Sequence, residues 1–160
     1  MSGGQVYSVD TSALIDGMER FYPRRNFPAL WERIDLLIDD GRMHISEEAW
    51  SEATSVDAPV REWCEEEGAG RERSVYATTA AVAAVAGQIG AQFPNWVKQG
   101  RKNGADPFVI AVAEVEGGMV ISGETNGGPG RPKIPYVCGQ RQVGHGRLVD
   151  LITSEDWVIG

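Results

Sequence analysis

VYSVDTSALI, residues 6–15, starts as a short apolar run, stops at Asp10 and continues with the spacing of a helix. A β-branched and aromatic run that ends on a small polar residue before a helix is typical of a buried parallel strand. Asp10 would then lie at the carboxyl end of the strand, the edge of an open α/β sheet where ligands bind. One acidic residue there does not define a site, whereas several carboxylates at the same edge would.

Length and composition fit one globular domain. The chain has 160 residues, of which 42% are hydrophobic and 24% charged, and we expect a single domain over residues 1–160. No apolar run approaches the roughly 18 residues of a membrane span, and the start of the chain lacks the features of a signal peptide. We therefore expect no membrane partner and a cytoplasmic location. Cys64 and Cys138 form no closely spaced pair, so they predict neither a disulfide framework nor a zinc site.

Charge is distributed unevenly along the chain. The net charge is −8, but residues 1–67 carry 15 acidic and 6 basic side chains, whereas residues 68–160 carry 8 acidic and 9 basic ones. A negative total disfavours a nucleic-acid partner, although the distribution matters more than the sum. An anionic ligand is therefore expected to meet the second half of the chain.

Periodicity predicts alternating strands and helices. Further strands are expected at 42–45 and 119–122, with a weaker signal near Val143. Helices are expected over 28–40, from 47, over 59–67, over 75–89, from 107 with Asp106 as its N-cap, over 134–139 and from 148. Loops or turns are expected over 18–26, 71–73, 98–104 and 126–132. This order predicts an α/β fold with three α/β/α layers, Rossmann-like, around a central, mostly parallel sheet.

Four carboxylates are expected at one edge of this sheet. Asp10 and Glu124 follow strands, and Glu52 and Asp106 are expected near the starts of helices. Because right-handed crossovers return the chain to the same edge, these side chains can converge. Gathered without a counter-charge they would repel one another, so a divalent cation with oxygen ligands, Mg²⁺ or Mn²⁺, best explains such a cluster.

Each of these residues also has a structural explanation when taken alone. Asp10 and Asp106 can cap helices, Glu48 and Glu52 can belong to a solvated helix face, and Glu124 can be an ordinary loop residue. The functional interpretation depends on their joint placement.

The same residues resemble the ordered motifs of PIN domains. These motifs are VDTSALID (9–16), the helix-borne Glu52, GADPFVIA (104–111) and VISGE (120–124), and KIPYVC (133–138) is similar to a further signature of one PIN-like branch. The resemblance covers nearly the whole chain. It implies a PIN fold and an Mg²⁺- or Mn²⁺-dependent endoribonuclease, often the toxin of a toxin–antitoxin pair. RNA as substrate, a cognate antitoxin protein and a homodimer are the partners that it implies.

The resemblance also implies roles for individual residues. The catalytic positions fall on Asp10, Glu52, Asp106 and Glu124, of which all but Glu52 would hold the metal. Supporting positions fall on Ser12, Ser122 and Glu48, the last of which competes with Glu52 for the second acidic position. Ser122 and Glu124 depart from the threonine and aspartate common in the family, which makes the fourth ligand the least secure.

Basic residues of the second half are candidates for contacts with the RNA backbone. They are Lys98, Arg101, Lys102, Arg131 and Lys133. Phosphate contacts of this kind add affinity and salt dependence with little sequence choice, and a solvated loop explains the same residues equally well. A single strand is the expected substrate because the deep groove of an RNA duplex hides its base edges.

Other kinds of site have less support. A dehalogenase-type phosphatase needs a second acid where this chain has Ser12, the adjacent acidic pair of a receiver is missing, and residues 127–133 lack the spacing of a P-loop. No motif supports Ser-His-Asp catalysis, and His44 and His145 have no visible partners in the sequence. The alternative left open is a PIN-like module that has lost activity and acts as a binding protein.

Overall fold

The computed structural model describes residues 4–98 and 104–159 and contains a parallel five-stranded sheet. The strands are β1 (Tyr7–Val9), β2 (Met43–Ser46), β3 (Val75–Tyr76), β4 (Met119–Ile121) and β5 (Gly144–Gly146). They lie in the order β3-β2-β1-β4-β5, and each neighbouring pair is parallel. Tyr7 is paired with Met43 on one side and Met119 on the other, so β1 is the central strand.

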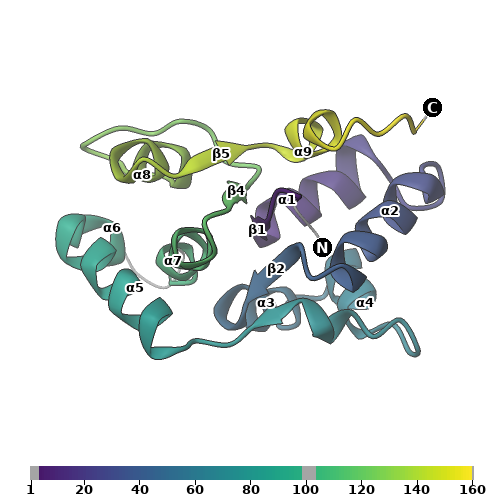
Figure 1. Cartoon of the computed structure of the whole chain (residues 1–160), viewed down its shortest axis with the longest axis horizontal. Coiled ribbons are helices and arrows are strands. Elements are labelled where there is room, and N and C mark those ends of the chain that lie inside the picture. Colours follow the sequence, from purple (N-terminus) through teal and green to yellow (C-terminus); the bar gives the residue numbers. More distant parts are fainter. Residues whose placement is uncertain (1–3, 99–103, 160) are drawn as a thin grey trace.

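Helices cover both faces of the sheet. Figure 1 shows α5, α7 and α8 on one side and α1, α2 and α9 on the other. The helical segments are α1 (Thr11–Asp16), the π-helical η1 (Gly17–Phe21), α2 (Pro28–Asp39), α3 (Glu47–Ala53), α4 (Pro59–Glu65), the 3₁₀-helical η2 (Arg71–Ser74), α5 (Ala80–Gln92), α6 (Pro94–Lys98), α7 (Asp106–Glu116), α8 (Ile134–Arg141) and α9 (Leu148–Ser154). The predicted α/β class, with three Rossmann-like layers and a parallel sheet, is confirmed.

The core is centred on β1 and α7. Helix α7 packs against β1, β2 and β4, and α5 covers α7 from outside. Val109 and Ile110 of α7 are fully buried, and the hydroxyl of Ser8 on β1 donates to the carbonyl of Val109 at 2.6 Å. The continuous apolar run at the start of α7 follows from this burial, because the helix faces the sheet on one side and α5 on the other. None of the helices in the described part of the chain is long and apolar enough to span a bilayer.

The helix predicted over 75–89 was wrong at its start. Val75 and Tyr76 form β3, where they pair with Ile45 and Ser46 of β2. The helix α5 begins at Ala80, and the side chain of Thr79 caps it by accepting from the amide of Val82 at 3.2 Å. The spacing of the apolar residues from Val75 onward fits a helix, but pairing with β2 makes Val75 and Tyr76 a strand instead.

Two smaller predictions also change. Residues 18–26 were expected to be a loop, but Gly17–Phe21 continues α1 as a π-helix. The weak strand signal near Val143 corresponds to β5, which begins one residue later at Gly144.

Arg71, expected in a turn, is a buried cation at the first residue of η2. Its side chain is 6% exposed and forms ion pairs with Asp35 at 2.8 Å and Glu66 at 2.8 Å. The guanidinium also donates to the carbonyl of Trp63 at 2.9 Å and lies 4.8 Å from the centroid of that indole ring. Arg71 therefore joins η2 to α2 and to the end of α4.

Candidate metal centre

The site begins where β1 ends. Asp10 follows the last residue of β1, and its amide donates to the carbonyl of Ile121 at 2.8 Å, so Asp10 lies against the end of β4. Its side chain caps α1 by accepting from the amide of Ser12. One carboxylate oxygen of Asp10 therefore caps the helix, which is the structural role that the sequence also allowed. The side chain nevertheless lies at the edge of the sheet.

Ser12 ties two chain turns together at this edge. Its hydroxyl donates to Asp10 Oδ2 and accepts from the amide of Gly123 at 2.9 Å. Glu124 follows Gly123 directly, so the hydroxyl links the residues after β1 to those after β4.

Asp106 is not the N-cap that its sequence context predicted. The cap is Ala105, α7 begins at Asp106, and the side chain of Ala105 makes no capping hydrogen bond. The prediction failed because the helix starts one residue earlier than expected. Asp106 is 5% exposed, and its carboxylate has neither a hydrogen bond nor an ion pair with any described residue. An unpartnered buried carboxyl group costs free energy, so helix capping does not account for it.

Three carboxylates converge at this point. Asp10, Asp106 and Glu124 each offer an oxygen, and these oxygens all lie within 4.8 Å of one another. They line a cavity of about 430 Å³, whose wall also includes Ser12 and Glu52. Glu52 reaches the wall from α3, but it lies in the last turn of that helix, where a position near the start was expected.

Burial raises the pKa values of all four carboxyl groups, and the charges of neighbouring carboxylates add to the rise for Glu52, Asp106 and Glu124. Burial is the largest cause for each, and it raises the pKa of Asp10, Glu52 and Glu124 above the usual range. For Asp106, burial and then the charges of Asp10, Glu124 and Glu52 raise the pKa to about 9. Without a cation, Asp106 therefore holds a proton at neutral pH, and a cation bound there would displace it.

The raised pKa of Asp106 makes the metal-free protein less stable as pH rises. Between the unfolded pKa of about 4 and the folded value of about 9, the unfolded chain has released a proton that the folded chain keeps. The proton on Asp106 therefore makes the free energy of unfolding largest at the acid end of this pH window. This contribution is lost as the pH rises toward the folded pKa. In a chelator at neutral pH, we expect Asp106→Asn to raise the free energy of unfolding by about 1 kcal/mol, or about 2–4 °C in melting temperature.

Thermal melts in chelator between about pH 5 and pH 9 measure this effect. The wild type should lose stability as pH rises, and Asp106→Asn should lose less. Asp40→Asn, at an exposed position of the C-cap of α2, is the matched control and should follow the wild type. A pH dependence that is the same in Asp106→Asn and in the wild type would contradict the burial argument.

Glu48 points away from the site. One of its carboxylate oxygens accepts from the hydroxyl of Thr78 at 2.6 Å, and the other is buried without a hydrogen-bond partner among the described residues. Glu48 is not among the residues that line the acidic cavity. Of the two candidates for the second acidic position, α3 therefore presents Glu52 to the other carboxylates.

Ser122 and His145 form a pair that the sequence did not reveal. Ser122 is fully buried at the end of β4, and its Oγ lies 2.7 Å from Nε2 of His145 on β5. The same Oγ accepts from the amide of Glu124 at 3.3 Å. His145, for which the sequence showed no partner, therefore supports the turn that carries Glu124. Burial lowers the pKa of this histidine.

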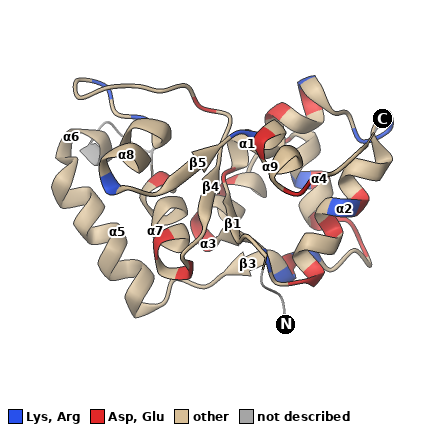
Figure 2. Cartoon of the chain, turned by 45° about the horizontal axis from the view of Figure 1, so that its top comes forward, with Lys and Arg blue, Asp and Glu red and all other residues tan. Residues whose placement is uncertain are grey.

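The basic candidates are only partly described. Arg131 is exposed and Lys133 half-buried on the loop between β4 and α8, where Figure 2 draws both basic and acidic segments. The charge of Lys133 also lowers the pKa of Glu124, although burial outweighs it. The side chain of Lys98, and Arg101 and Lys102 altogether, lie outside the described residues.

Comparison with known families gives one match. The model of a family described as "Domain of unknown function (DUF4411)" matches residues 7–159, a range that holds the whole sheet and all four carboxylates of the cavity. No curated protein matches the chain.

Proposed function

The chain belongs to the family described as a domain of unknown function (DUF4411), and from its acidic site we propose that it is a metal-dependent endoribonuclease. In this proposal it hydrolyses phosphodiester bonds of single-stranded or structured RNA with Mg²⁺ or Mn²⁺. The substrate class follows from the resemblance of its motifs to PIN domains. The proposal includes a role as the toxin of a toxin–antitoxin pair, with a cognate antitoxin protein as partner, and a homodimer.

The observation that carries the proposal is the group of three carboxylate oxygens within 4.8 Å of one another. Asp10 and Asp106 are buried, and no basic side chain of the described segments forms an ion pair with either of them or with Glu124. Hard oxygen ligands without histidine or cysteine fit Mg²⁺ or Mn²⁺ better than zinc. The donor set therefore fits the ion that the proposed activity needs.

The residues of the cavity divide into two roles. Asp10, Asp106 and Glu124 would hold the cation, which when bound supplies a Lewis acid for a phosphate oxygen and a more acidic water. Glu52 lies on the same wall, and its pKa is raised by burial and by the charge of Asp10. A carboxylate of that kind can accept the proton of the attacking water. The hydroxyl of Ser12 fixes the position of Asp10 relative to Gly123, the residue before Glu124.

Metal binding tests the proposal without any substrate. A ligand that binds only the folded state at 100 times its dissociation constant stabilises it by about 2.7 kcal/mol, which corresponds to roughly 5–11 °C for a chain of this size. We expect Mn²⁺ or Mg²⁺ to raise the melting temperature of the wild type by such an amount. The rise should vanish in Asp10→Asn and Asp106→Asn, because each loses a charged ligand.

The control for this experiment is again Asp40→Asn, which removes an exposed carboxylate of α2 and should keep the full rise. A melting curve that does not change at millimolar metal would favour the inactive binding module.

A further inference from the structure

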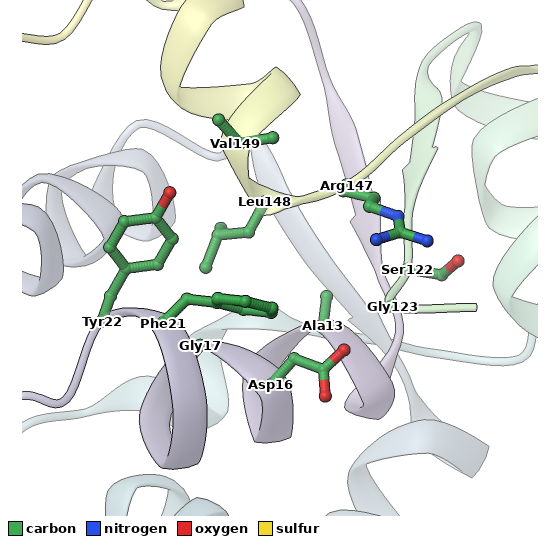
Figure 3. Close-up of a pocket in the computed structure, with 10 residues that line it drawn as sticks. All are labelled: Ala13, Asp16, Gly17, Phe21, Tyr22, Ser122, Gly123, Arg147, Leu148 and Val149. Carbon is green, nitrogen blue, oxygen red and sulfur yellow. The ribbon is translucent and has the colours of Figure 1, made fainter. Parts of the chain in front are cut away.

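A second cavity lies next to the acidic one, between the α1–η1 segment and the start of α9 (Figure 3). Its volume is about 210 Å³, and its lining is largely apolar. The two cavities are lined by neighbouring residues of the same segments, because α1 carries Ser12 on the first and Asp16 on the second, and Gly123 of the second directly precedes Glu124 of the first. A ligand that extends from the acidic cavity along these segments can reach the second cavity.

One side of the second cavity is aromatic and aliphatic. Figure 3 shows Phe21, Tyr22 and Leu148 on the side away from Gly123. Phe21 belongs to this lining and is 57% exposed, so part of its ring is open to a ligand. Phe21 is the last residue of η1, and π-helical turns occur frequently at functional sites. An exposed ring at the mouth of a cavity offers a face on which a planar group can stack.

The opposite side carries two opposite charges. Asp16 and Arg147 lie beside Gly123 (Figure 3), and a Cβ added to Gly123 would collide with Oδ2 of Asp16. The side chain of Asp16 does not cap η1, and neither charge takes part in an ion pair within the described residues. The cavity thus presents, on one side, a carboxylate and a guanidinium that form no ion pair with the described residues and, on the other, a stacking surface.

We propose that this second cavity binds a guanine base of the RNA, at a nucleotide adjacent to the phosphate held at the acidic site. This inference rests on the proposed function. The Watson–Crick edge of guanine offers two neighbouring N–H groups, which Asp16 can accept with both carboxylate oxygens, next to an O6 acceptor for Arg147. No other standard base presents two neighbouring N–H nitrogens to one carboxylate. Phe21 stacks on the plane of the base, as aromatic side chains do with unpaired RNA bases.

The spacing of the two cavities suits neighbouring parts of one strand. Asp10 caps α1 at its start and Asp16 ends it, so their backbone positions are separated by about 9 Å along the helix axis at 1.5 Å per residue. A base next to the phosphate at the acidic site can bridge that separation. Phosphate contacts carry no sequence information, so contacts in this cavity would determine which base the enzyme prefers.

Binding of short RNA in chelator tests the inference without cleavage. The probes are fluorescently labelled oligouridines that contain one central guanosine, inosine or adenosine, and the readout is the dissociation constant from anisotropy. We expect the wild type to bind the guanosine probe about 10-fold more tightly than the other two, because inosine lacks one N–H group and adenosine presents a different edge. Equal binding of the three probes by the wild type would overturn the proposal, and this comparison needs no variant.

Two variants separate the contributions of the two sides of the cavity. Asp16→Asn should remove the difference between guanosine and inosine, with Glu19→Gln, an exposed carboxylate on η1, as matched control. Phe21→Ala should weaken all three probes by about 10-fold while leaving their order unchanged. Leu36→Ala, at an apolar residue 63% exposed on α2, is its control. An Asp16→Asn variant that melts like the wild type and keeps the guanosine preference would also overturn the proposal.

The outcome is distinguishable from failure of the nuclease proposal. Metal-dependent cleavage with no dependence on guanine leaves the nuclease and rejects the guanine cavity. A guanosine preference without a metal-dependent rise in melting temperature and without cleavage keeps the base-binding cavity and rejects the nuclease.

Discussion

Asp10→Asn is expected to lower metal-dependent cleavage of single-stranded RNA by about 100-fold to 1000-fold, the size of effect seen when one group that stabilises developing charge is removed. Asp10 is one of the three carboxylates whose oxygens converge, and asparagine keeps its shape while removing its charge. Asparagine is also as good an N-cap as aspartate, so α1 should still form. The measurement is the initial rate of cleavage of a labelled RNA in Mg²⁺ or Mn²⁺, with chelator as blank.

The exposed Asp40→Asn variant, purified in the same way, should cleave at the wild-type rate. Cleavage that survives in Asp10→Asn at the wild-type rate would point to a contaminating nuclease or to another site. Loss of cleavage in Asp10→Asn together with an unchanged fold would leave the acidic cavity as the place of the chemistry.

Arg71→Ala is expected to destabilise the protein by about 3 kcal/mol, since truncating one partner of a buried ion pair typically costs about this much. The change removes the ion pairs to Asp35 and Glu66, a hydrogen bond to the carbonyl of Trp63 and the stacking of the guanidinium on that ring. For a chain of this size the melting temperature should fall by roughly 6–12 °C. Chemical or thermal denaturation in the presence of chelator measures the change without a contribution from metal.

Arg73→Ala provides the matched comparison on the same 3₁₀-helical segment. Arg73 also forms an ion pair, with Asp39, but its side chain is 57% exposed. Exposed pairs contribute about 0–1 kcal/mol, so this variant should melt close to the wild type. Similar losses for the two variants would mean that burial of Arg71 is not the source of its contribution.

The architecture was predictable because its signals are local. Apolar runs that stop at Asp10 and before Glu124 mark strand ends, and the Asp-Pro pair at 106–107 marks the start of a helix to within one residue. Because the strands are parallel and joined by crossovers, these positions lie at the same edge of the sheet. The start of α5 was not predictable in this way, since Val75 and Tyr76 fit a helical period and become a strand only because β2 is present to pair with them.

The supporting contacts of the site are non-local, and the sequence did not reveal them. Ser12 meets the amide of Gly123 across 111 residues, and Ser122 meets His145 across 23. Glu48 and Glu52 are one helical turn apart, so sequence spacing could not choose between them. The structure distinguishes the two glutamates because the hydroxyl of Thr78, between β3 and α5, donates a hydrogen bond to Glu48.

The two outermost strands are short. β3 has 2 residues and β5 has 3, the first and last of which are glycines. A long outer strand displays a row of free amide and carbonyl groups on which another chain can continue the ladder, whereas strands this brief display few of them. A second copy is therefore expected to dock through helical surfaces, and concentrated solutions of the folded protein should resist fibril growth by sheet extension.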